Sequence, residues 1–120
     1  MREITFVCYP RCTTCKKAEK WLADKDIAVK VRDIKEDNPS CAELRLWHEK
    51  SGLPLKRFFN TSGLKYKELG LKDKLAGMSA DEQYELLSTD GMLVKRPLLV
   101  MEDKVLVGFK EQEWQDCFQG

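Results

Sequence analysis

The 120-residue chain has a single histidine, no long apolar run and almost no net charge. Its 21 basic and 20 acidic side chains give a formal net charge of +1. Such a balance supplies no global field to attract nucleic acid or an anionic membrane surface. No segment approaches the roughly 20 apolar residues of a membrane span, and the apolar run after Ile4 is too short for a signal-peptide core. We therefore expect a cytoplasmic protein with no membrane and no direct nucleic-acid partner.

Cysteine is present in an odd number, which excludes a simple secreted disulfide framework. Five cysteines in a lysine- and glutamate-rich chain favour reduced thiols with a reactive subset. Three of them fall close together, at Cys8, Cys12 and Cys15, where an apolar run gives way to a lysine-rich amphipathic one. The chemistry of these thiols is therefore the main question that the sequence raises.

The order of the predicted elements indicates one α/β domain that spans residues 1–120. Residues 3–9 are β-branched and aromatic, as in a buried strand, and residues 13–25 have apolar positions at helical spacing. Residues 28–34 alternate as a second strand. A strand, a helix and a strand in about three dozen residues predict a βαβ unit with parallel strands.

A helical insert is expected at about residues 38–92. Ser40 and Glu43 have the spacing of a capping box at a helix start, and Ser79 and Glu82 repeat it. Glycines separate the short helices of this region. We expect the insert to belong to the same domain, because neither part looks complete alone.

The chain after the insert predicts a hairpin and a closing helix. Residues 97–102 and 105–109 have the pattern of two antiparallel strands joined by a tight turn, and residues 110–119 that of a helix. The complete order is β-α-β, insert, β-β-α, which is the order of a thioredoxin-like domain with a mixed four-stranded sheet. In such a fold Pro97 occupies the position of a cis proline that faces the nucleophile, and Arg96 can point at an anion there.

Cys12 is the expected nucleophile. It falls where a strand ends and a helix begins, and there unpaired N–H groups and the helix dipole favour an anion such as a thiolate. Arg11, Lys16 and Lys17 add positive charge nearby, so we expect the pKa of Cys12 to lie below that of free cysteine. Cys15, one helical turn inside on the same side, is placed to attack a mixed disulfide on Cys12 and release it. Cys15 is therefore the expected resolving thiol.

The C-x-x-C spacing alone leaves other interpretations open. A zinc site would need two further ligands, and Cys41, His48 and Cys117 offer no second metal-binding pattern, so no metal is expected. Inert packing is the alternative for Cys15. Cys8, Cys41 and Cys117 are expected to fill structural positions, and His48 to be a surface or interface histidine rather than a general base.

Four segments carry a family pattern across nearly the whole chain: YPRCTTCKKAEKWL, FFNTSGLKYKELGL, SADEQYELLSTDGMLVKRP and VLVGFKEQEW. Its most specific parts are the cysteine after YP, the KRP before the third strand and the GF before the last helix. With these segments the chain resembles the arsenate reductase-related (ArsC) family, including its Spx and YusI-like branches. The resemblance implies a thioredoxin-like fold with a helical insert.

The resemblance also implies a set of site residues. In glutaredoxin-linked arsenate reductases the cysteine that matches Cys12 attacks arsenate, three arginines hold the oxyanion, and glutathione resolves the adduct. Arg96 matches one of those arginines. Asn60 and Lys110 stand where the other two belong, and lysine does not reproduce the bidentate arginine fork. No bound cofactor is implied, and the electron donor would be glutathione, a glutaredoxin or a thioredoxin.

Three functions follow as hypotheses. The first is an arsenate reductase-like thiol-disulfide oxidoreductase that acts on a disulfide, a glutathione adduct or a small oxyanion, with Cys12 attacking and Cys15 resolving. The second is an Spx-type redox-sensing regulator whose partner is the RNA polymerase alpha subunit. The third is a family member whose thiols no longer do chemistry. For the first hypothesis, the expected substrate site comprises Arg11, Asn60, Arg96, Pro97 and Lys110.

Overall fold

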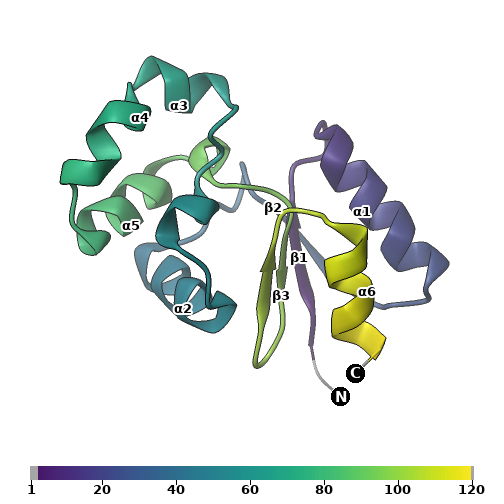
Figure 1. Cartoon of the computed structure of the whole chain (residues 1–120). Helices are drawn as coiled ribbons and strands as arrows, with labels where there is room; N and C mark the ends of the chain where they lie inside the picture. The colour runs from purple at the N-terminus through teal and green to yellow at the C-terminus, as the bar shows by residue number, and fades with distance from the viewer. Residues whose placement is uncertain (1–2, 120) are drawn as a thin grey trace.

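The computed structural model describes residues 3–119 and places a four-stranded sheet between two layers of helices (Figure 1). Given in their order across the sheet, the strands are β2 (Lys30–Asp33), β1 (Thr5–Cys8), β3 (Leu98–Val100) and β4 (Val105–Val107). β1 is parallel to β2 and antiparallel to β3, and β4 is antiparallel to β3. The prediction of a thioredoxin-like domain with a mixed sheet is therefore confirmed.

The helices cover the two faces of the sheet. Figure 1 shows α1 (Thr13–Asp24) and α6 (Glu111–Gln119) on one side and the helical insert on the other. The insert consists of α2 (Cys41–Ser51), η1 (Leu55–Phe58), α3 (Leu64–Glu68), α4 (Leu71–Lys74), η2 (Leu75–Gly77), α5 (Ala80–Thr89) and η3 (Gly91–Leu93). Within residues 3–119, no helix has both the length and the apolar character that crossing a membrane would require.

The strands are shorter than the sequence pattern predicts. β1 ends at Cys8, and the backbone N–H of Cys12 donates to the carbonyl of Tyr9 across a tight turn, at 2.9 Å. That turn takes the chain out of the sheet one residue before the end of the predicted strand, which runs to Tyr9. The turn is also what brings Cys12 to the start of α1.

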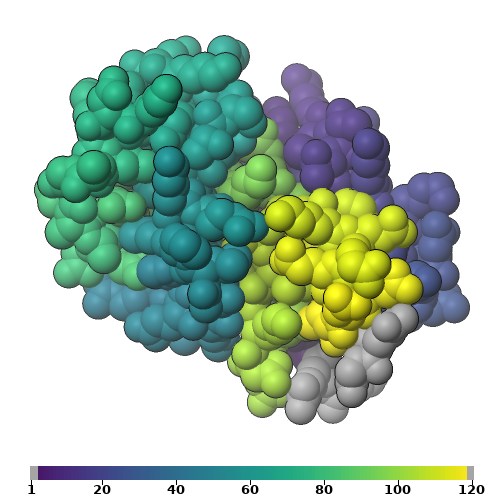
Figure 2. Space-filling view, in the orientation of Figure 1, coloured from purple at the N-terminus to yellow at the C-terminus, as the bar shows by residue number. Residues whose placement is uncertain are grey.

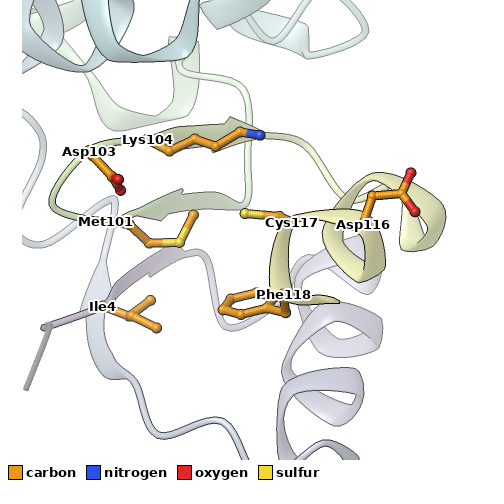
Figure 3. Close-up of a pocket in the computed structure, with 7 residues that line it drawn as sticks. All are labelled: Ile4, Met101, Asp103, Lys104, Asp116, Cys117 and Phe118. Atoms are coloured by element: carbon orange, nitrogen blue, oxygen red, sulfur yellow. The ribbon is translucent and has the colours of Figure 1, made fainter. Parts of the chain in front are cut away.

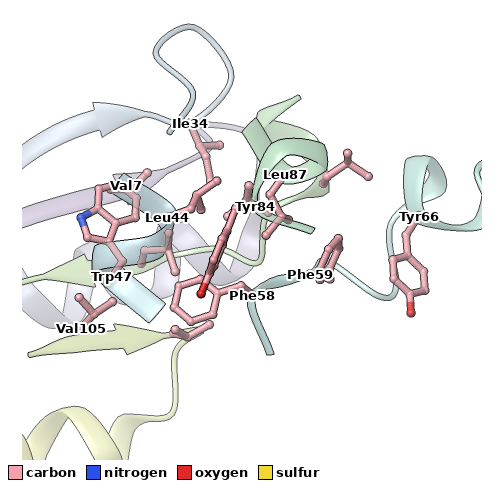
Figure 4. Packing of buried hydrophobic residues seen from close by; sticks show 14 of the residues in the cluster. Val7, Ile34, Leu44, Trp47, Phe58, Phe59, Tyr66, Tyr84, Leu87 and Val105 are labelled. Atoms are coloured by element: carbon pink, nitrogen blue, oxygen red, sulfur yellow. The ribbon is translucent and has the colours of Figure 1, made fainter. Parts of the chain in front are cut away.

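The sheet separates two apolar clusters, because successive side chains of a strand point to opposite faces. Val7 of β1 belongs to the cluster on the insert side, whereas Phe6 and Cys8 belong to the cluster under α1 and α6. Figure 4 shows the insert-side cluster, in which Trp47 of α2 and Tyr84 of α5 pack with residues of the sheet. The insert thus shares a core with the sheet.

Helical spacing predicted the buried faces with one error. The four inward positions predicted for α1 are all buried: Cys15, Ala18, Trp21 and Leu22. In α2, Leu44 and Trp47 are buried, but Leu46 is 47% exposed, which corrects the expectation that it joins the apolar side. A helix turns by roughly 100° per residue, so Leu46 lies about 200° around the axis from Leu44.

Arg32 of β2 and Glu43 of α2 form a bidentate ion pair that joins the sheet to the insert. The Nη1–Oε2 distance is 2.6 Å and the Nη2–Oε1 distance is 2.9 Å. Glu43 also completes the predicted capping box with Ser40, and Ser79 and Glu82 form the second one. The hydrogen bonds from Arg32, which outweigh burial, lower the pKa of Glu43 from 4.5 to about 2.

Glu43→Gln is expected to remove part of the acid dependence of stability. The folded-state pKa is lowered, so the stabilisation is present above pH 4.5 and is lost as the pH falls toward 2. We expect about 1 kcal/mol, because the Glu43 side chain is 38% exposed and solvent screens the pair. Urea unfolding between pH 2 and pH 7 measures the free energy of unfolding of the wild type and of Glu43→Gln, with Glu36→Gln as the control. If this free energy depended on pH in the same way in the wild type and in Glu43→Gln, the expected contribution of Glu43 would be contradicted.

Gly91 allows the end of the insert to approach the sheet closely. A Cβ at this position would lie 1.8 Å from the carbonyl oxygen of Ile34, the residue that follows β2. This oxygen belongs to the backbone, as does the Cα that would carry the new Cβ, so relieving the clash would require the backbone to shift, at a cost in stability. The side chains of Ile34 and Leu93 are fully or almost fully buried at the same contact.

Gly91→Ala is expected to destabilise the fold by about 2–3 kcal/mol, because the backbone of η3 must move away from Ile34. The matched control is Gly77→Ala, since a Cβ at Gly77 meets nothing within 4 Å. We expect the control to change stability by less than about 0.5 kcal/mol. Chemical denaturation measures the free energy of unfolding of both variants, and equal values would show that the contact at Gly91 is unimportant.

Candidate functional site

Cys12 stands immediately before α1 as its N-cap. Its backbone is extended, with φ −82° and ψ 123°, and its carbonyl accepts the first hydrogen bond of the helix, from the Lys16 N–H at 3.1 Å. The side chain is half-buried. A side chain in this position faces the free N–H groups of the first helical turn, which carry partial positive charge.

The surroundings of Cys12 favour its thiolate. Burial acts against ionisation, but the backbone N–H and thiol of Cys15 and the guanidinium of Arg96 outweigh it. The pKa of Cys12 is therefore below its ordinary value, as the sequence predicted. The cation beside the thiol is Arg96.

Cys15 lies next to Cys12 in a very different environment. Its thiol is 2% exposed and accepts a hydrogen bond from the backbone N–H of Tyr9 at 3.4 Å. Burial raises its pKa to about 12, and the neighbouring Cys12 and Cys8 add to that rise. Burial likewise raises the pKa of Cys8 to about 11, with further contributions from nearby acidic groups. At neutral pH, Cys12 is thus the thiol of this group that ionises most readily.

Arg96 approaches Cys12 from the segment that leads into β3. The Arg96–Pro97 peptide bond is cis, as predicted, and the carbonyl of Pro97 accepts from the Gly108 N–H at 2.8 Å. The guanidinium carbon of Arg96 lies 5.2 Å from the centre of the Tyr9 ring, within cation–π range. Its Nε and Nη1 are buried, and neither has a hydrogen-bond partner among residues 3–119. Buried donors without partners cost free energy, so they favour an acceptor that arrives at this place.

Tyr9 is a site residue that sequence reasoning missed. Its ring contacts Arg96, which lies beside Cys12, and its backbone N–H donates a hydrogen bond to the sulfur of Cys15. Tyr9 therefore contacts both Arg96 and the second thiol of the pair. A signal was present, because an aromatic residue at the end of a strand and before a proline has its ring near the strand terminus. The pairing of that ring with Arg96 depends on the register of two strands, which spacing along the chain does not give.

The structure does not join the other predicted substrate-site residues to Cys12. Arg11 and Lys110 are exposed. The amide of Asn60 is engaged elsewhere, because Nδ2 donates to the carbonyl of Met92 in η3 and Oδ1 accepts from the Ser62 hydroxyl, each at 3.5 Å. Among residues 3–119, the groups that lower the pKa of Cys12 belong to Cys15 and Arg96, and none of these three residues is one of them.

The remaining cysteines and the histidine lie elsewhere. His48 Nδ1 is 2.6 Å from the Tyr84 hydroxyl, and the His48 ring also packs against Phe58, so it lies at the contact between α2 and α5. Cys41 and Cys117 are half-buried free thiols. Among residues 3–119, no group of three or more histidine, cysteine, aspartate or glutamate side chains is arranged as a metal site.

A separate hollow of about 460 Å³ lies at the other end of the sheet, where Ile4 precedes β1 (Figure 3). Sulfur atoms of Met101 and Cys117 line it together with the Phe118 ring. Cys12 follows the opposite end of β1, so this hollow is no part of the thiol site.

Comparison with known proteins identifies the family. The model of the ArsC family matches residues 8–117, a range that contains Cys12, Cys15 and Arg96. This chain belongs to the ArsC family. YusI of Bacillus subtilis, an uncharacterized protein, is 55% identical over 113 residues, which cover 94% of this chain and 96% of YusI.

Solved ArsC-like structures agree with the fold in detail. A putative ArsC family related protein from Bacteroides fragilis superposes with a TM-score of 0.93 at 54% identity, covering 95% of this chain and 96% of that one. A possible arsenate reductase from Streptococcus mutans superposes with a TM-score of 0.87 at 46% identity, covering 96% of this chain and 99% of that one.

Sequence comparison also finds regulators. The global transcriptional regulator Spx of Listeria innocua is 26% identical to this chain, over 92% of this chain and 82% of Spx. The ArsC family therefore connects the chain both to possible reductases and to regulators.

Arg96→Met is expected to raise the pKa of Cys12, because it removes the cation beside the thiolate while keeping an unbranched side chain. The rate of alkylation by iodoacetamide, followed from pH 5 to pH 10, should shift to higher pH and fall several-fold at pH 7. Arg11→Met is the matched control and should leave the profile nearly unchanged, because Arg11 is exposed. Equal effects of the two substitutions would contradict the assignment to Arg96.

Proposed function

We propose that this ArsC-family protein is a thiol-disulfide oxidoreductase in which Cys12 is the nucleophile and Cys15 the resolving thiol. The observation that supports this most directly is the pairing of a half-buried thiol of lowered pKa with a buried thiol of raised pKa, in contact and one helical turn apart. In such a pair, the thiol of lowered pKa is ready to attack a disulfide, and the thiol of raised pKa stays protonated until the second step.

The first step forms a mixed disulfide. The Cys12 thiolate attacks one sulfur of a substrate disulfide, a Cys12–substrate S–S bond forms, and the other substrate sulfur leaves as a thiolate. Arg96 lies beside the reacting sulfur and stabilises its negative charge before the attack. In addition, the free Nε–H and Nη1–H groups of Arg96 are available to an anionic group of the substrate, such as a glutathione carboxylate.

The second step releases the substrate. Cys15 loses its proton, its sulfur attacks the Cys12 sulfur, and the remaining substrate sulfur leaves as a thiolate. The substrate disulfide has then gained two electrons, and the Cys12–Cys15 pair has lost two. The charge of Cys12 is one cause of the raised pKa of Cys15. Since a mixed disulfide removes that charge, Cys15 becomes easier to ionise at the moment when it must react.

The oxidised pair must then be reduced again. Glutathione, a glutaredoxin or a thioredoxin can supply the two electrons by the same exchange chemistry. These donors belong to the reducing cytoplasm, and we place the activity there.

Arsenate is the weaker candidate substrate. Arg96 offers unpaired donors to an oxyanion, but the amide of Asn60 is engaged by Met92 and Ser62, and Lys110 is an exposed residue before α6. A tetrahedral anion would therefore have one arginine to hold it. We expect glutathione-linked disulfide reduction to exceed arsenate reduction in parallel assays.

Replacing each thiol separately tests the roles. With oxidised glutathione, Cys15→Ser should accumulate a stable glutathione adduct on Cys12, because no resolving thiol remains, whereas the wild type should proceed to the Cys12–Cys15 disulfide. Cys12→Ser should form neither product. Cys117→Ser is the control and should behave as the wild type. Intact-mass and peptide mass spectrometry distinguish the products, and oxidation of Cys8, Cys41 or Cys117 ahead of the Cys12–Cys15 pair would overturn the proposal.

A redox-sensing regulator of the Spx type is the second candidate, supported by the sequence similarity to Spx regulators and by the adjacent thiols Cys12 and Cys15. In this case the dithiol would change the affinity for RNA polymerase when it oxidises. A binding assay with the C-terminal domain of the polymerase alpha subunit, under reducing and oxidising conditions, separates the two functions. Binding that depends on the redox state favours the regulator, and absence of binding in both states rejects it.

A further inference from the structure

One segment of the helical insert carries a positive charge that the net charge of the chain conceals. Residues 55–77 contain six basic and two acidic side chains, a net charge of +4 in a protein of net charge +1. Residues 79–90, which contain α5, carry four acidic side chains and no basic one. We call the first group the insert basic surface, and it comprises Lys56, Arg57, Lys65, Lys67, Lys72 and Lys74.

The six cations of the insert basic surface are exposed and unpaired. Each is exposed, and none forms an ion pair or a side-chain hydrogen bond with another of residues 3–119. By contrast, Arg32 and Arg45 on β2 and α2 both pair with acidic side chains. An excess of unpaired positive charge along residues 55–77 favours an anionic partner, because no acidic side chain among residues 3–119 neutralises these six cations by an ion pair.

A small apolar hollow opens within this surface. It has a volume of about 280 Å³, with Lys56 and Lys72 at its sides. Its other lining residues are Leu55, Tyr66, Leu75, Ala76 and Gln83. The side-chain amide of Gln83 donates hydrogen bonds to the carbonyls of Leu75 and Met78, at 3.4 and 3.1 Å, and these bonds hold it in one wall of the hollow. A site with apolar walls between two lysines suits an apolar side chain that has carboxylates on either side.

The apolar walls of the hollow favour a polypeptide over a nucleic acid. The phosphates of a nucleic acid would gain nothing from walls formed by Leu55, Tyr66 and Leu75. An acidic stretch of polypeptide supplies carboxylates for the two lysines and can also supply an apolar side chain for the hollow.

We propose that the insert basic surface binds a short acidic segment of a partner protein, with one apolar side chain of that segment in the hollow between Lys56 and Lys72. The insert forms its own lobe of the molecular surface, beside the part that carries α1 and α6 (Figure 2). The binding surface therefore lies in the insert, on the face of the sheet opposite to the cluster that holds Cys12.

Titration of the ¹⁵N-labelled protein with a synthetic peptide tests this directly. The probe is a short peptide of aspartate and glutamate around a single leucine. Amide shifts should be confined to residues 55–77 and to Gln83, and the affinity should fall as salt is raised. A peptide with serine in place of the leucine should bind more weakly. Shifts centred on Cys12 and Arg96 instead, or equal binding of the serine peptide, would overturn the proposal.

Charge reversal provides the matched comparison. Lys56→Glu combined with Lys72→Glu should weaken peptide binding at least about tenfold. Lys25→Glu combined with Lys104→Glu makes the same change of charge outside the insert and should leave the affinity within about twofold. Cys12→Ser should also bind normally. An equal loss in both double variants, or binding of a single-stranded oligothymidylate as tight as that of the peptide, would show that the surface does not select an acidic polypeptide.

Discussion

The contact of the Cys12 sulfur with Arg96 and with the start of α1 is the interaction on which the site depends. A half-buried thiolate loses water that would stabilise its charge, and the protein must replace it with N–H groups and a cation. The sheet register supplies that cation. Val7 pairs with Leu98, and because β1 and β3 are antiparallel, the residues that follow Val7 lie beside those that precede Leu98. The turn at Tyr9 then brings Cys12 to Arg96.

The two helical layers of the fold pack on the sheet through separate apolar clusters. The cluster under α1 and α6 holds Cys8, Cys15 and the partly buried Cys12, whereas the insert packs on the opposite face through a cluster of its own. The apolar core of the insert is therefore separate from the apolar surroundings of the thiols.

The sequence predicted the parts of this structure that depend on neighbours along the chain. Capping boxes at Ser40 and Ser79, the inward face of α1 and the order of the elements along the chain all follow from local spacing, and all are present. What spacing could not supply is contact between distant segments. Spacing along the chain pointed to Arg11, Lys16 and Lys17 as cations near Cys12. Arg96, more than eighty positions away, was expected beside Cys12 only from the fold, and it is the residue that contacts the thiol. The loop contacts that engage the Asn60 amide were invisible for the same reason.

Three cysteines in one short stretch differ in acidity because their surroundings differ in burial, hydrogen bonding and charge. Cys8 and Cys15 are almost completely buried, and their thiols resist ionisation, whereas Cys12 is half-buried and meets N–H groups and a guanidinium. In the exchange reaction that we propose, this difference in acidity would set the order of the steps, because the sulfur that is already charged would attack first. It would also limit side reactions, since the two protonated thiols would compete poorly for the substrate. The packing of the α1 side of the sheet thus decides which of the three thiols ionises most readily.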